Sequence, residues 1–143
     1  MELCRLPPLP DGQLVVDRWT EPFWQACAKH RLTVPECLQC GLQRMPPTPF
    51  CPGCQGQTLR WVEVSGRGQI YSFTVVRRAI IAGMDTQIPY VPAVVSLQEY
   101  PAIRLISAVI DSDIANVGIG SAVTVAWRPG RDGRDLPFFE LLL

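Results

Sequence analysis

Four of the six cysteines stand in two matching pairs, and their spacing is that of a metal site. Cys37 and Cys40 are separated by two residues, ten residues follow, and Cys51 and Cys54 repeat the same spacing. A Cys-x-x-Cys turn places two sulfurs on one side of a tight loop, and two such turns facing each other supply the four tetrahedral thiolate ligands that structural Zn²⁺ prefers. We therefore predict a zinc ion held by these four residues. A redox dithiol, disulfides and spare thiols are the alternatives.

A zinc ion with four thiolate ligands has no position open to water or substrate, so it would stabilise the fold rather than act as a Lewis acid. The remaining residues offer little for catalysis. His30 is the one histidine, and it stands between Lys29 and Arg31, where a solvated residue at a helix end is expected. Asp111 and Asp113 precede a glycine-rich turn, where aspartate is common for turn reasons. We find no complete set of catalytic residues in the sequence.

The cysteine pairs lie in the second of three zones into which the chain divides. Residues 1–34 hold a proline-rich arm and a predicted helix over 17–31, with Thr20 as its N-cap. Residues 35–60 contain the four cysteines and five prolines but almost no periodic apolar pattern, so something other than their own side chains, such as a bound metal, must order them. In the first zone, Cys4 belongs to an arm that we expect to be loose, and Cys27 fits the apolar face of the helix.

The third zone, residues 61–143, reads as β-structure. Tyr71, Phe73 and Val75 alternate with polar residues, which is typical of a half-buried strand. Four further strands are predicted by apolar runs or alternation, at 93–97, 103–110, 123–127 and 138–143, with turn signals between them. The expected fold is thus mainly β: an N-terminal helix, a zinc-binding segment and a small barrel or sandwich of five strands.

The amino-acid composition argues against nucleic-acid binding and against membrane binding. The 143 residues include 13 basic and 13 acidic side chains, so the net charge is zero, and Lys29 is the only lysine. Proteins that bind nucleic acid independently of its sequence normally have a basic surface, so the zero net charge argues against this class of protein. Neither a secretory signal nor an apolar run long enough for a membrane helix is apparent, so we expect a cytoplasmic protein that does not bind membranes.

The order of these motifs resembles one known family. The chain runs from Cys40-Gly41 through Met45-Pro46-Pro47 to the second cysteine pair, then to Trp61, to the segment 65–72 (SGRGQIYS), to Pro89-Tyr90 and to the segment 119–123 (IGSAV). This is similar to the acyl-CoA-associated proteins that join a rubredoxin-like zinc ribbon to an OB-fold and were first catalogued as a domain of unknown function. The resemblance covers about residue 19 to the C-terminus. It implies a rubredoxin-like ribbon followed by a five-stranded OB-fold barrel.

The resemblance also implies a role. Members of this family are accessory subunits of thiolase-like enzymes, including a retro-aldolase of steroid side-chain degradation, or of MaoC-like enoyl-CoA hydratases. We therefore expect a non-catalytic or co-catalytic subunit that binds a thiolase-fold enzyme acting on acyl-CoA, in a hetero-oligomer such as a heterotetramer. Acyl-CoA would be the ligand of the complex, and the subunit would stabilise the enzyme and complete its CoA channel. A MaoC-like hydratase is the alternative partner. A nucleic-acid-binding OB module and a free-standing enzyme are rivals from other classes.

Partner and ligand contacts are expected at three places. Trp19, Phe23 and Trp24 put aromatic rings on more than one face of the helix, as either a partner surface or internal packing would require. Leu142 and Leu143 end the chain with apolar side chains, which we assign to a partner contact. Arg77 and Arg78 follow the first barrel strand and are candidates for the CoA phosphates, although a solvated loop is the plainer interpretation.

Overall fold

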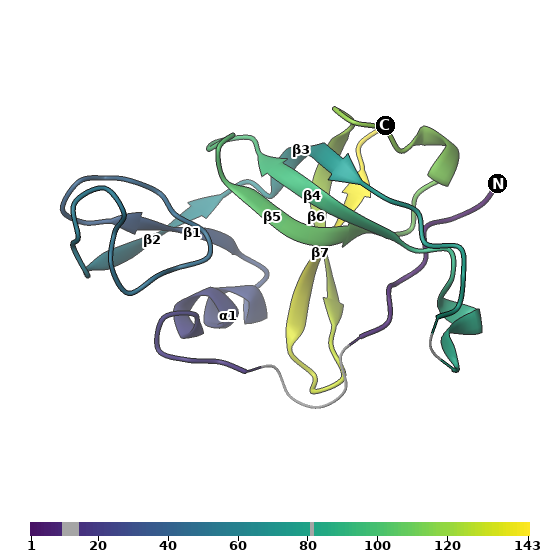
Figure 1. Cartoon of the computed structure of the whole chain (residues 1–143), viewed down its shortest axis with the longest axis horizontal. Helices are drawn as coiled ribbons and strands as arrows, with labels where there is room; N and C mark the ends of the chain where they lie inside the picture. Colours follow the sequence, from purple (N-terminus) through teal and green to yellow (C-terminus); the bar gives the residue numbers. More distant parts are fainter. Residues whose placement is uncertain (10–14, 81) are drawn as a thin grey trace.

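The computed structural model describes residues 1–9, 15–80 and 82–143. Figure 1 shows two parts side by side: a short helix with a two-stranded sheet at one end, and a β-barrel at the other. The N-terminal arm runs along the barrel, so the two ends of the chain lie at the same end of the molecule. Among the described residues, no helix has the length and apolar character needed to cross a membrane.

The helix α1 (Glu21–Ala28) is shorter than predicted. The segment before it forms a turn instead, because Asp17 Oδ1 accepts the backbone N–H groups of Trp19 and Thr20, both at 2.9 Å. Thr20 occupies the N-cap position, but its side chain makes no capping bond to the helix. After the helix ends, His30 has a φ of 56°, in the left-handed region that often closes a helix C-terminus, and Arg31 N–H donates to Ala26 O at 3.0 Å.

Strands β1 (Leu32–Cys37) and β2 (Leu59–Val64) form the antiparallel sheet of the ribbon. Their pairing runs from Leu32 opposite Val64 to Cys37 opposite Leu59, so the first cysteine of the motif stands at the end of β1. All six residues of β1 are buried, since the strand is covered by its neighbours on both faces. The proposed boundary between residues 60 and 61 falls inside β2, which leads directly from the ribbon to the barrel.

Five strands close the barrel, as the sequence predicts. They are β3 (Arg67–Phe73), β4 (Val91–Leu97), β5 (Arg104–Val109), β6 (Ala122–Pro129) and β7 (Asp135–Leu141), in the spatial order β3-β4-β5-β7-β6. Closure comes from β3, which pairs with β4 on one side and with β6 on the other. Two short 3₁₀ helices, η1 (Met84–Gln87) and η2 (Ile114–Asn116), lie in the connections after β3 and β5. This is the architecture of an OB-fold.

The first barrel strand differs in detail from the expectation. It covers residues 67–73 rather than 71–75, and a β-bulge falls between Ile70 and Ser72. A bulge shifts the alternation of inward and outward side chains. As a result Ile70 is buried at 1% exposure, whereas Tyr71 is 51% exposed and its ring lies 3.8 Å from the guanidinium carbon of Arg104.

The N-terminal arm is also more ordered than expected. Leu3 forms a β-bridge with Asp113, and Cys4 N–H donates to Ser112 O at 2.8 Å. Cys4 is 1% exposed and belongs to the same core cluster as Phe23 of the helix and Phe139 of the barrel. The prediction of a loose terminus was wrong, because the arm adds an extended segment to the barrel instead of leaving it.

Candidate metal centre and partner surfaces

The two cysteine pairs are positioned by turns at the far end of the ribbon. Cys37 N–H donates to Leu42 O at 2.8 Å, and Gly41 N–H returns to Cys37 O at 2.9 Å. Gly41 has a φ of +79°, a conformation that glycine adopts without steric cost. The second turn repeats the pattern, with Cys51 N–H donating to Gly56 O at 2.8 Å. Each turn buries one cysteine and leaves the other at the surface.

The four sulfurs converge on one point. All lie within 4.8 Å of one another, and the Cys37–Cys54 and Cys40–Cys51 Sγ–Sγ distances are both 3.6 Å. A tetrahedral zinc ion with bonds of about 2.3 Å would place its sulfurs about 3.8 Å apart. The donor set therefore fits structural zinc, with residues drawn from both cysteine pairs.

Backbone N–H groups favour the thiolate at each cysteine of the cluster, but the four side chains differ. Leu42 N–H favours the Cys40 thiolate, yet neighbouring cysteines and burial raise the pKa of Cys40 to about 12. Gly56 N–H favours the Cys54 thiolate, yet burial and neighbouring cysteines raise the pKa of Cys54 above its ordinary value. The N–H of Cys40, followed by that of Gln39, outweighs burial and lowers the pKa of Cys37 to about 6. Burial acts against ionisation of Cys51, but the N–H groups of Cys54 and Gly53 outweigh it and lower the pKa of Cys51 below its ordinary value. Gly53 N–H also lies 3.4 Å from Cys51 Sγ. These donors offset the negative charge that four thiolates bring to the metal.

A buried carboxylate holds the ribbon together beside the metal site. Glu36, on β1, accepts hydrogen bonds from Gln43 Nε2 at 2.7 Å and from the guanidinium of Arg60 on β2. The Gln43 amide and then Arg60 lower the pKa of Glu36. The carboxylate thus ties both strands to the loop that leads to the second cysteine pair, which is a structural role.

His30 does more than end the helix. Its Nε2 lies 3.1 Å from Asp135 Oδ2, and its ring stacks on Trp127 with centroids 5.3 Å apart. The expectation of a merely solvated residue was therefore incomplete, because His30 joins the helix to the barrel. Cys27 lies near the same aspartate, but burial and then Asp135 raise the pKa of its thiol to about 12. A thiol that stays protonated is a poor nucleophile, so these three residues do not form a Cys-His-Asp catalyst.

The predicted contact residues are dispersed over the molecule. Phe23 is buried at 6% exposure, Trp24 packs partly buried against the same core, and Trp19 lies under the Arg18 guanidinium at 4.6 Å. Leu142 and Leu143 lie at the other end of the molecule with exposures of 41% and 104%.

The two arginines proposed for CoA lie on the exposed segment after β3. Arg77 pairs with Glu2 of the N-terminal arm at 2.7 Å, and Arg78 is exposed. The structure does not bring either arginine to the cysteine cluster, and their assignment to CoA stays a prediction.

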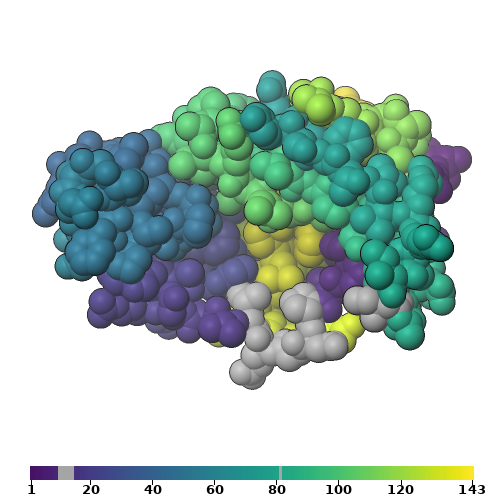
Figure 2. All heavy atoms as spheres, in the orientation of Figure 1, coloured from purple at the N-terminus to yellow at the C-terminus, as the bar shows by residue number. Residues whose placement is uncertain are grey.

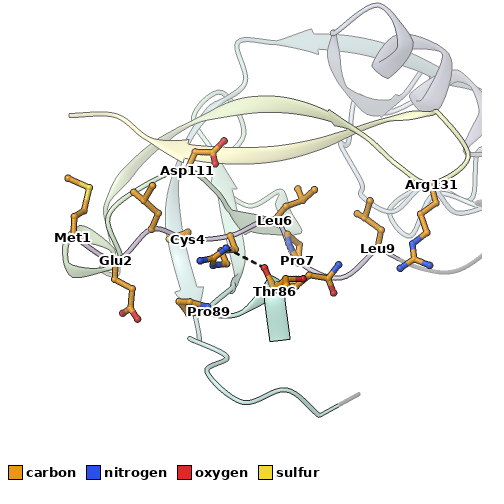
Figure 3. Close-up of a pocket in the computed structure, with 13 residues that line it drawn as sticks. Met1, Glu2, Cys4, Leu6, Pro7, Leu9, Thr86, Pro89, Asp111 and Arg131 are labelled. Carbon is orange, nitrogen blue, oxygen red and sulfur yellow. Dashed lines mark hydrogen bonds between the residues drawn. The ribbon is translucent and has the colours of Figure 1, made fainter. Parts of the chain in front are cut away.

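A hollow of about 900 Å³ lies along the N-terminal arm. Figure 3 shows Met1 and Glu2 at one end, Leu9 and Arg131 at the other, and Cys4 and Leu6 between them. One hydrogen bond, from Arg5 Nη1 to Thr86 O at 3.3 Å, links the arm to η1 across this hollow. Sequence reasoning missed this feature, because nothing local in residues 1–9 marks them as part of the barrel surface.

A second hollow of about 460 Å³ separates α1 and the ribbon from β5 and β7. Its lining is mainly apolar and includes Phe23 and Trp24 from the helix, and Leu105 and Phe138 from the barrel. One indication of this hollow is visible in the sequence: Arg104 and Ser107 interrupt an otherwise apolar run over 103–110.

Comparison with known proteins matches both parts of the chain. Residues 24–60 match the family model described as the rubredoxin-like zinc ribbon domain of ChsH2, and residues 61–128 match its C-terminal OB-fold domain. Among solved structures, the chain titled "Ltp2-ChsH2(DUF35) aldolase" aligns with a TM-score of 0.81 and 28% identity, over 92% of this chain and all of that one.

Curated relatives fall into two groups. One group holds longer proteins: the probable enoyl-CoA hydratase alpha subunit of Thermomonospora curvata, 32% identical over 82% of this chain, and the 3-oxo-4,17-pregnadiene-20-carboxyl-CoA hydratase alpha subunit of Mycobacterium tuberculosis, 31% identical over 77%. This chain spans about a third of their length, 36% and 34% respectively.

The other group includes a DUF35 domain-containing scaffold protein of Methanocaldococcus jannaschii, 30% identical over 69% of both chains. These matches agree with the geometry of the cysteine cluster and with the order of the barrel strands, and they confirm the ribbon and OB-fold expected from the sequence. The chain belongs to the DUF35 family, in which a ChsH2-type rubredoxin-like zinc ribbon precedes an OB-fold.

Proposed function

We propose that this chain is an accessory subunit that binds a thiolase-fold enzyme acting on acyl-CoA. The observation that carries the proposal is the match to the chain titled as part of an Ltp2-ChsH2(DUF35) aldolase, which extends over that chain's whole length. A match that includes ribbon, helix and barrel in one arrangement supports a shared mode of action better than a match of either module alone.

The chemistry of the described residues supports an accessory rather than a catalytic role. The four thiolates fill the coordination sphere of zinc, so the metal has no position for a substrate. His30 is already engaged with Asp135 and Trp127, and the nearby Cys27 thiol has a raised pKa. Turnover would therefore depend on residues of the partner enzyme, and this chain would stabilise that enzyme and border its CoA channel.

The acyl group and the ligand contacts belong to the same proposal. Names of the relatives include a CoA thioester of a steroid carboxylic acid, which supports an acyl-CoA with a bulky acyl group as the substrate of the complex. Arg77 and Arg78 are our candidates for the CoA phosphates, because both are exposed cations. Leu142 and Leu143 are candidates for the enzyme contact, because they are exposed apolar residues at the end of the chain.

A MaoC-like hydratase is a second candidate partner. The specific observation in its favour is that two relatives are named as hydratase alpha subunits and are at least 31% identical over the aligned residues. In that case the partner enzyme would catalyse enoyl-CoA hydration instead of carbon–carbon bond cleavage or acyl transfer, and this chain would be its accessory subunit.

One experiment separates these possibilities. The tagged chain is purified from its native host under mild conditions, and the proteins that elute with it are identified and quantified by mass spectrometry. A thiolase-like enzyme in stoichiometric amount is the expected result, and a hydratase in that amount supports the second candidate. Elution of the chain alone, or acyl-CoA turnover by the isolated chain, contradicts the accessory role.

A further inference from the structure

Strand β5 directs some of its backbone N–H and C=O groups away from its neighbour β4. Leu97 N–H donates to Ile103 O at 3.1 Å, which sets the phase of the antiparallel pairing between β4 and β5. Hydrogen-bonded pairs alternate with unbonded pairs along such a ladder. Counting from Ile103, the backbone N–H and C=O groups of Arg104 and Ile106 must therefore point away from β4.

These groups face the side on which β7 lies, but β7 does not reach them. The two strands pair in parallel at one position, Val109 opposite Phe139, and a side-chain bond from Ser107 Oγ to Pro137 O at 2.8 Å marks the limit of their approach. Within the described residues, the main chain of residues 104–106 consequently has an open edge along the barrel.

The apolar hollow of about 460 Å³ lies directly along this edge. Its lining includes apolar residues from α1, from the ribbon loop, from β5 and from β7: Phe23, Trp24, Met45, Leu105, Pro137 and Phe138. Arg104 and Ile106 of the open edge line it as well. In Figure 2 the yellow atoms of β7 are visible between the purple N-terminal region and the green strands above it. An open strand edge combined with apolar pockets beside it is the arrangement by which proteins bind an extended peptide as an added strand.

The open edge has little of the protection against pairing that exposed edges of monomeric proteins normally carry, such as charges, prolines, bulges or a covering segment. Arg104 is its one charged residue, and the guanidinium lies over the ring of Tyr71. Ile106 presents an apolar side chain that is 88% exposed.

The chain itself shows that the barrel accepts an added segment at the neighbouring position. Just beyond β5, Asp111 N–H donates to Cys4 O at 2.9 Å, and Leu6 and Leu9 of the arm pack against the cluster of Ala108, Ile110 and Phe138. The arm thus covers the barrel at the end of β5, and within the described residues it makes no backbone hydrogen bond to the main chain of residues 104–106.

We propose that an extended, apolar segment of the partner enzyme pairs with the main chain of residues 104–106 and inserts alternate side chains into the hollow between α1, β5 and β7. This inference rests on the proposed function, since it names the place at which the enzyme docks. Main-chain hydrogen bonds would provide affinity, and the aromatic and apolar walls would select the inserted side chains.

Two variants of one residue test the main-chain pairing. Ile106→Pro removes an N–H that does not bond to β4, so the sheet keeps its ladder while the open edge loses a donor. Ile106→Ala is the matched control, because it shortens the side chain and keeps the N–H. The enzyme that copurifies with the wild-type chain is titrated with each variant, and the dissociation constant for Ile106→Pro is expected to exceed that for Ile106→Ala by about tenfold.

Further measurements keep the test independent of folding. Ile106→Glu alters a side chain that is almost fully exposed in the free chain, so this variant should fold normally, yet it should weaken binding at least about tenfold by placing a carboxylate against apolar walls. In hydrogen exchange, the Ile106 amide is expected to exchange fast in the free chain and slowly in the complex, whereas the Leu105 amide, which faces β4, is protected in both.

Each outcome of these experiments either supports or contradicts the proposed docking site on β5. Equal affinities of the proline and alanine variants, or unchanged exchange at Ile106 in the complex, would overturn the docking site and leave the accessory role intact. If no enzyme copurifies with the wild-type chain, both proposals fail together. Slow exchange at Ile106 in the free chain, with self-association in solution, would show that a second copy of the chain occupies the edge instead.

Discussion

Gly68 stands where the barrel closes, and its replacement by alanine gives a quantitative test of that closure. Gly68 pairs with Leu97 of β4 and with Val123 of β6, so two strands flank it closely. A Cβ atom at this position would lie 2.3 Å from Ser96 O, where ordinary contacts begin at 3.4 Å. Strands β3 and β4 must therefore separate by about 1 Å at this point, because a backbone oxygen cannot turn aside as a side chain would.

The expected loss of stability follows from three contributions. Overpacking costs about 1–3 kcal/mol, and a weakened ladder hydrogen bond adds about 1 kcal/mol. The lower entropy of the unfolded alanine variant offsets about 0.4–1 kcal/mol. The free energy of unfolding of Gly68→Ala should therefore fall by about 1–3.6 kcal/mol, which corresponds to a melting midpoint lower by about 3–11 °C.

The assay is thermal unfolding followed by circular dichroism, with zinc present in all samples. Gly118→Ala is the matched control, because its Cβ would meet only Ser121 Oγ at 3.6 Å, an ordinary contact, and the midpoint should stay the same or rise slightly. Equal midpoints for Gly68→Ala and the wild-type chain would refute the argument that β3 has no room for a side chain at the closure.

Three further predictions concern the metal centre and the link between helix and barrel. Removal of zinc by a strong chelator, or the substitution Cys51→Ser, should abolish the protection of amides in residues 37–58 against hydrogen exchange, while the barrel strands stay protected. If metal analysis finds no zinc and the exchange pattern is nevertheless unchanged, the structural role of zinc is contradicted. Zinc retention should fall as the pH is lowered below about 6, where protons compete even for Cys37, whose pKa is lowered to about 6; constant zinc content from pH 7 to pH 4 would argue against thiolate ligation. His30→Ala should lower the free energy of unfolding by about 1–2 kcal/mol, because the ring stack on Trp127 and the half-exposed contact with Asp135 are both lost. Denaturant titration of this variant and of Asp135→Asn separates the two contributions.

Local chemistry explains which features could be predicted from the sequence. The spacing of Cys37, Cys40, Cys51 and Cys54 specifies two turns and four converging thiolates with little help from the rest of the chain. The barrel strands were recognisable because each carries its own apolar pattern and is bounded by turn residues. The family resemblance added the OB-fold barrel, which no single strand encodes.

Other features depend on contacts between segments far apart in the sequence, and only the tertiary structure decided them. The bulge at Ile70 exposes Tyr71, and the pairing with residues 111–114 buries Cys4 in a segment that looks unstructured by itself. His30 acquires its role through Asp135, 105 positions away.

The open edge of β5 also depends on contacts between segments far apart in the sequence. An apolar run predicts a strand but does not say which of its neighbours will pair with it along its full length. That depends on the strands β5 and β7 meeting only at Val109 and Phe139, so that the residues before this pair stay apart, and therefore on the closure of the whole barrel. The sequence determined the zinc ligands and the strands, because both are set by short-range patterns, whereas the surface that we assign to the partner exists only once the barrel has closed and the helix has packed beside it.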